Sequence, residues 1–205
     1  MGMACELLAL TPGQMDAICD SYKLAHKVVF GDYDEDEDED EDKDKDKDED
    51  EREDEGPAKL AGEPLRERLY IDKCWGLLRF MLNKAGGQGD SKGDWTGDIL
   101  FADMAGAITE IDAGYGFPPY LRSVEATREF ADFLSTLTVE QLLSHWDTEE
   151  MLKDRVYLVY KEGDPARQEE ADRDLRGYAA SHFPDFRAYV MQAAAAGCGL
   201  LISIG

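Results

Sequence analysis

The residues with the most suggestive chemistry lie in one short apolar block near the middle of the chain. A carboxylate, an ammonium and a guanidinium fall close together there, at Asp72, Lys73 and Arg79. With Trp75 and the more distant Tyr115, they would line a polar pocket for a small ligand or a substrate. Acid–base catalysis there would require Asp72 or Lys73 to have a shifted pKa and to lie in a cleft.

The same block also has a structural interpretation. Trp75, Leu78 and Leu82 recur at helical spacing, which predicts a helix that begins near Asp72 and buries one apolar stripe. In that interpretation the Asp72 side chain caps the helix and favours its positive end. Lys73 then pairs with a carboxylate elsewhere in the fold.

A second candidate site is the aromatic turn at residues 114–121, in which glycines and prolines surround Tyr115, Phe117 and Tyr120. Exposed aromatic rings on a rigid turn suit recognition of a partner, because they offer a large contact area at low ordering cost. In the alternative, the rings fold inward and hold the loop in place, since aromatic side chains are usually buried.

Other familiar chemistries lack their signatures. His26, His145 and His182 are far apart and have no zinc-binding spacing. The sequence also lacks a serine nucleophile elbow and a phosphate-binding loop. It therefore predicts no metal and no bound cofactor. The cysteines are scattered and are expected to be reduced, mostly buried thiols: Cys5, Cys19, Cys74 and Cys198.

Charge is concentrated in one run. The 205 residues carry a formal net charge of −24, and residues 32–55 hold 19 acidic and four basic residues, a local net charge of −15. Such a run has no apolar face to bury and repels itself, so it predicts a disordered insertion loop. The charge argues against direct nucleic-acid binding and favours basic partners.

No stretch approaches the ~20 consecutive apolar residues that a membrane helix needs. The first residues have neither the basic segment nor the cleavage site of a secretory signal. The sequence thus predicts a cytoplasmic protein without a membrane segment.

Around the candidate sites, helix-start signals alternate with a few strand-like runs. Strands are expected at residues 3–10, 156–160 and 200–204, with one helix from Pro12 that fades near Val29. Later helices are expected after Ser123, Thr138 and Asp147, and two more begin at Pro165 and Pro184. The predicted fold is α+β: one domain made of residues 1–31 and 56–205, with helices on a small mixed sheet that includes both terminal strands.

Three stretches resemble a bacterial family of unknown function, DUF1877, also called YfbM-like. The opening Met1-Gly2-Met3 with Thr11-Pro12 matches its start, and the block from Leu69 to Leu82 is similar to its motif L-D-I-D-K-x-W-x-x-L-H-F-L-L. The aromatic turn and the apolar ending also resemble the family. The resemblance covers nearly the whole chain outside the acidic run, and it implies one α+β domain without an established activity.

Two positions depart from the family pattern. Tyr70 stands where the family often has Asp, and Arg79 stands where it often has His. If that His were catalytic in the family, this chain would lack it.

Two functional hypotheses follow. The first is a non-enzymatic cytoplasmic protein-interaction module, with an unidentified protein partner and, by analogy with small acidic bacterial proteins, an immunity-like role. The alternative is a small-ligand-binding protein or enzyme with a polar pocket around Asp72, Lys73 and Tyr115.

Replacing residues 32–55 with a short Gly/Ser link is expected to leave the fold and its thermal stability unchanged. The closure entropy of a loop depends only weakly on its length, so shortening the loop gains little. Thermal unfolding of the two chains checks this prediction, and a large loss of stability would show that the run packs on the domain.

Overall fold

Two apolar strands from opposite ends of the chain form the centre of the sheet. The computed structural model describes residues 2–30, 67–87, 100, 106–107, 111 and 118–205. β1 (Cys5–Leu10) pairs antiparallel with β5 (Gly199–Ile204) over its whole length. β2 (Leu69–Tyr70), β4 (Tyr120–Arg122) and β3 (Gly106–Ala107) complete the order β2-β1-β5-β4-β3, in which every pair is antiparallel.

Side chains of the central strands alternate between two separate cores. On β5, Leu200, Ile202 and Ile204 enter the larger core. Leu201 and, on β1, Leu8 enter the smaller one. Successive side chains of a strand point to opposite faces of its sheet, so an uninterrupted apolar run is what a strand covered on both faces requires.

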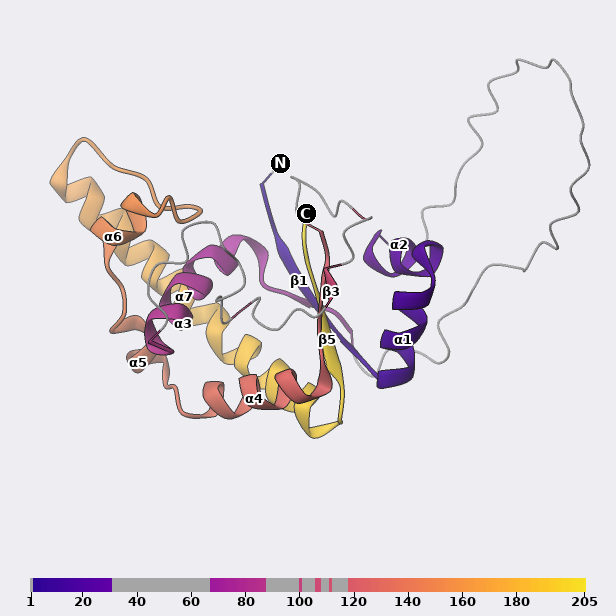
Figure 1. Ribbon diagram of the computed structural model, residues 1–205. Coiled ribbons are helices and arrows are strands. Elements are labelled where there is room, and N and C mark those ends of the chain that lie inside the picture. The colour runs from indigo at the N-terminus through magenta and orange to yellow at the C-terminus, as the bar shows by residue number, and fades with distance from the viewer. Residues whose placement is uncertain (1, 31–66, 88–99, 101–105, 108–110, 112–117) are drawn as a thin grey trace, which may run out of the picture.

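Helices cover both faces of the sheet. α1 (Pro12–Asp20) and α2 (Tyr22–Phe30) lie on one side of it in Figure 1, and the remaining α-helices lie on the other. These are α3 (Trp75–Ala85), which follows a 3₁₀ turn at Asp72–Cys74, then α4 (Val124–Ser135), α5 (Val139–Leu143), α6 (Thr148–Lys153) and α7 (Pro165–Ala195). The predicted α+β class, the single domain and the terminal strands in the sheet are confirmed. The expected mixed sheet is wrong, since all the strand pairs among the described residues are antiparallel.

Helix starts follow the predicted capping signals. Thr11 and Thr138 each form a complete capping box, with Gln14 and Gln141 respectively. Ser123 accepts a hydrogen bond from the Ala126 amide. These short polar side chains satisfy amides that the first helical turn leaves without a partner.

One long helix replaces the two that were expected after residue 164. α7 runs unbroken through Pro184, although a proline removes one backbone hydrogen bond from a helix interior. Pro184 is exposed, whereas Ala179, Phe183 and Phe186 on either side are buried. Burial of the apolar face therefore holds the helix together, and the proline sits on the solvent side, where helical bonds lengthen most readily.

Two other expectations about elements are wrong. Residues 156–160 do not form a strand, because Arg155 and Leu158 have φ values of 54° and 76°, which break an extended backbone. The first helix is two helices, since Ser21 is extended and its side chain accepts a hydrogen bond from the Leu24 amide.

Within the described residues, the structure contains no helix with the length and apolar character to cross a membrane.

Gly199→Ala is expected to destabilise the protein by about 1–3 kcal/mol, the typical cost of overpacking. A Cβ at Gly199 would overlap the Met15 sulfur and the Arg122 carbonyl oxygen, and the backbone atom cannot move aside without disturbing β4. Urea unfolding measures the effect. The matched control is Gly13→Ala, where the space is open and the change should be neutral or stabilising; equal stability of the two variants would contradict the prediction.

Candidate functional site

Asp72 lies in a turn that forces its backbone into the left-handed region. The chain leaves β2, the Ile71 amide donates to the Cys5 carbonyl, and Asp72 then adopts a φ of 45°. Asp is one of the few residues other than Gly that enter this region readily. The turn presents the Asp72 side chain toward α7, so the residue does not cap α3 as one interpretation expected; neither the 3₁₀ turn nor α3 has a side-chain cap.

Two tyrosine hydroxyls donate to the Asp72 carboxylate. Tyr178 Oη lies 2.5 Å from Oδ2, and Tyr70 Oη lies 3.3 Å from Oδ1. The bond from Tyr178 is the main cause that lowers the pKa of Asp72, and burial is the main cause that raises the pKa of Tyr178. At neutral pH this arrangement is a fixed anion beside a neutral donor, which does not suit proton transfer.

Lys73 and Trp75 lie against the first residues of the chain. Trp75 Nε1 donates to the Met3 carbonyl at 3.2 Å, and the Met3 amide donates to Tyr157 Oη at 3.0 Å. The Trp75 and Tyr157 rings stack at 5.8 Å. A side chain at Gly2 would collide with Lys73 and Tyr157. Lys73 and Trp75 thus lie against the first residues of the chain and Tyr157, whereas the Asp72 carboxylate bonds to Tyr178 and Tyr70.

The other predicted site residues do not all join this group. Arg79 is half-buried further along α3, and Tyr120 is 8% exposed in the larger core, which leaves its ring little surface for a partner. Tyr115 and the acidic run at 32–55 lie outside the described residues.

The cysteine thiols beside the site are not reactive nucleophiles. Cys5 and Cys74 are completely buried. Burial is the main cause that raises the pKa of both, to about 12 for Cys74. A thiol in that state carries almost no thiolate at neutral pH. Across the described residues, no three His, Cys, Asp or Glu side chains gather in a way that could hold a metal ion.

Sequence reasoning missed Tyr157 and Tyr178. Tyr178 is 106 positions from Asp72, and no local spacing links them. The His182 ring packs edge-on against Tyr178, one helical turn further on, with ring centroids 4.7 Å apart. Only the path of α7 brings these aromatic residues to the turn after β2.

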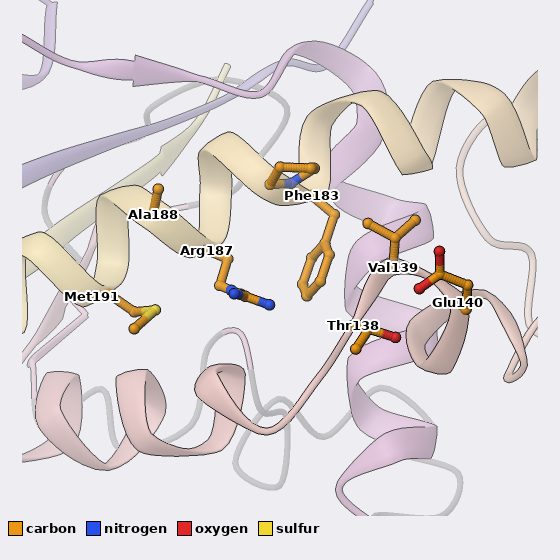
Figure 2. A pocket seen from close by; sticks show the side chains of 8 residues that line it. Thr138, Val139, Glu140, Phe183, Arg187, Ala188 and Met191 are labelled. Atoms are coloured by element: carbon orange, nitrogen blue, oxygen red, sulfur yellow. The ribbon is translucent and has the colours of Figure 1, made fainter.

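A separate groove opens between the start of α5 and the middle of α7. Figure 2 shows α7 along one wall and the segment that carries Thr138 along the other. Its volume is about 430 Å³, and eight residues line it: Thr138, Val139, Glu140, Phe183, Pro184, Arg187, Ala188 and Met191. No local pattern predicted this groove, because its walls are far apart in the chain.

Two charged residues define the polar part of the groove. Arg187 Nη1 donates to the Leu137 carbonyl at 2.6 Å, which links α7 to the segment between α4 and α5. Glu140 is exposed in the first turn of α5, and its pKa is lowered chiefly by the hydrogen bond from its own backbone amide and then by that from the Thr138 side chain. The groove thus has an apolar floor, an engaged guanidinium and an ionised carboxylate at its edge.

Tyr178→Phe is expected to lower stability by about 1 kcal/mol at pH 7, the size of one hydrogen bond to a largely solvated carboxylate. A lowered carboxyl pKa stabilises the fold above the ordinary value of 3.8, and this contribution is lost as the pH falls through the folded-state pKa. The difference from the parent chain should therefore be smaller at pH 3 than at pH 7, because the loss begins once the pH falls below 3.8.

Urea midpoints at pH 7 and pH 3 measure this difference. Tyr160→Phe is the control, because Tyr160 is 60% exposed. A Tyr178→Phe penalty that stays constant with pH would contradict the assignment of the Tyr178 bond to the ionised carboxylate.

Comparisons with known proteins agree with this architecture. The crystal structure of YfbM from Escherichia coli, a protein of unknown function, matches with a TM-score of 0.59 at 14% sequence identity, covering 98% of this chain and 99% of that chain. At this identity the likeness shows the fold alone. No curated protein matches the sequence. The model of the domain of unknown function DUF1877 matches residues 1–203, and the chain therefore belongs to the DUF1877 family.

Proposed function

We propose that this DUF1877 protein is a non-enzymatic protein-interaction module of the cytoplasm that binds a helix of a partner protein in the α5–α7 groove. The observation that carries the proposal is an open groove with an apolar floor on the surface of the domain. An immunity-like role, in which binding neutralises the partner, is the form of this function that suits a small acidic protein.

The groove has the surface that a helix needs for docking. Along α7, Pro184, Ala188 and Met191 are all exposed and lie four and three residues apart, which places them on one face. Met191 is 38% exposed, although soluble domains usually bury methionine. Val139 extends the apolar surface across the groove. An amphipathic helix with apolar residues at i, i+3 or i+4 and i+7 would fill such a groove.

The charged groups at the groove and the net charge of the chain indicate which kind of partner helix would bind. The Arg187 guanidinium already donates to a backbone carbonyl, whereas the Glu140 carboxylate is exposed and ionised at the edge. The whole chain carries −24, so a second copy of this protein is repelled and a basic partner is attracted. The expected occupant is therefore a partner helix with an apolar face flanked by Lys or Arg.

The chemistry around Asp72 supports a binding role over catalysis. Its carboxylate pKa is lowered, and the pKa values of Tyr178 and of the buried thiol of Cys74 are raised. A general acid or base works best with a pKa near the working pH. All three pKa values move away from neutral pH, so these groups keep the same charge state at the working pH.

A photo-crosslinking residue in place of Met191 is expected to capture a specific partner in the source cell. The control position is Lys23 on α2, which is exposed on the opposite side of the sheet. Mass spectrometry should map the crosslink at position 191 to an amphipathic, basic helix of the partner.

Purified partner then gives the quantitative test. Ala188→Glu places a charge on the exposed apolar face of α7 and should weaken binding at least about tenfold, while Lys23→Glu should change only the salt-dependent attraction. Unchanged affinity of the Ala188→Glu variant, or equal crosslinking at both positions, would exclude the groove as the binding surface.

A further inference from the structure

We propose that Asp72, Tyr70 and Tyr178 form a binding site for a guanidinium group. The site shares no residue with the α5–α7 groove, so the inference does not depend on the function proposed above. It assigns a ligand class to the region that the sequence had marked as a candidate pocket.

The carboxylate keeps room for a cation. Each oxygen of Asp72 accepts one tyrosine hydroxyl, at 2.5 Å from Tyr178 and at 3.3 Å from Tyr70. An ionised carboxylate offers about four acceptor positions, and the Lys73 backbone amide occupies one more of them, which leaves about one position for a further donor. The residue is half-buried, and part of it faces solvent. A guanidinium N–H can donate to that position, and a hydrogen bond between two charged groups is stronger than one between neutral groups.

An exposed aromatic ring lies beside the carboxylate. Tyr70 is 54% exposed, which is unusual for a large aromatic side chain on a two-residue strand. Its hydroxyl is tied to Asp72, so the ring is ordered although it faces solvent. Planar guanidinium groups stack on such rings, whereas a compact, strongly hydrated ammonium gains less from them.

Two features hold the carboxylate in place before any ligand binds. The backbone of Asp72 has a left-handed conformation that Asp tolerates, and the hydrogen bond from the Ile71 amide to the Cys5 carbonyl fixes the turn before it. Tyr178, in turn, is braced by the edge-on ring of His182. A ligand therefore meets a preorganised anion and loses little free energy in ordering it.

Charged groups of both signs surround the site. Glu6 is the strand partner of Tyr70 and adds a second carboxylate at this sheet edge. Arg68 Nη1 lies 3.1 Å from Glu6 Oε2, so this pair offsets the Glu6 charge and shows that a carboxylate at this edge accepts a guanidinium. Lys73 is the opposing charge, and its side chain packs against Gly2 and Tyr157. The lowered pKa of Asp72 is consistent with an anion at neutral pH.

The probes are N-acetyl-arginine N-methylamide and its neutral isostere, the same derivative of citrulline. In NMR titrations of the full chain, the arginine derivative should shift resonances of residues 69–73 and 178–182, and the citrulline derivative should not. Free arginine and a capped Gly-Arg-Gly peptide distinguish the source of the guanidinium. Tighter binding of the free amino acid indicates a small-molecule ligand, and tighter binding of the peptide indicates a partner's side chain.

Variants test each part of the site. Asp72→Asn keeps the shape and the tolerance of a left-handed backbone, and it should weaken binding at least about fivefold. Tyr70→Ala, at an exposed position, should do the same, while Tyr70→Phe should retain the contribution of the ring. Lys73→Gln should tighten binding by removing the opposing charge.

Three results would overturn the proposal: equal shifts with the citrulline derivative, unchanged affinity in both Asp72→Asn and Tyr70→Ala, or weaker binding in Lys73→Gln. Ala188→Glu is the independent control. It should leave guanidinium binding unchanged even if it abolishes docking in the groove, so failure of one site is distinguishable from failure of the other.

Discussion

The antiparallel pairing of β1 with β5 is the interaction on which the rest of the structure depends. It joins the two ends of the described chain through the register from Cys5–Ile204 to Leu10–Gly199, and the Ala4 and Gly205 backbones extend it by one further pair of hydrogen bonds. Both strands are buried on both faces. Every helix therefore packs, directly or through a neighbour, on a surface that exists only after the chain ends have met.

α7 is the second integrating element, because one helix connects the sheet with both candidate sites. Tyr189 Oη accepts a hydrogen bond from the Ala9 amide at 2.9 Å, at a point on β1 that the two-residue β2 does not reach. A buried amide without such a partner would be costly. Further toward the N-terminus, the same helix supplies Arg187 to the groove and Tyr178 to Asp72. Its continuity through Pro184 keeps these three contacts in a fixed relation.

The two candidate sites share one physical property. Each contains a carboxylate with a lowered pKa, which stays ionised and carries no proton at neutral pH. Asp72 is held as an anion by hydroxyl donors, and Glu140 is held as an anion by the start of a helix. Hydrogen bonds to the charged form lower a carboxyl pKa and make the group a worse base. Such groups suit recognition of a cation or a basic surface more than they suit catalysis.

Local sequence patterns predicted much of the fold but only part of the candidate site. Apolar runs, capping boxes and the family motif predicted both terminal strands, most helix starts and the burial of Trp75, Leu78 and Leu82. These local patterns failed where packing decides the outcome. Pro184 predicted the start of a new helix, but burial of the apolar face keeps α7 continuous. The β-rich residues 156–160 predicted a strand, but they do not pair with the sheet. Asp72 was found by its type and Tyr178 was not, because a hydrogen bond between residues 106 positions apart leaves no local pattern.

The sequence by itself thus determined both terminal strands, most helix starts and the excess of negative charge, since these follow from residue type and short spacing. Tertiary structure decided what the polar residues do. It turned Asp72 from an expected cap into an acceptor for two tyrosines, placed Tyr120 in the core and opened a groove between distant segments. These outcomes depend on which helix crosses which turn, and that is fixed by packing of the whole chain around β1 and β5.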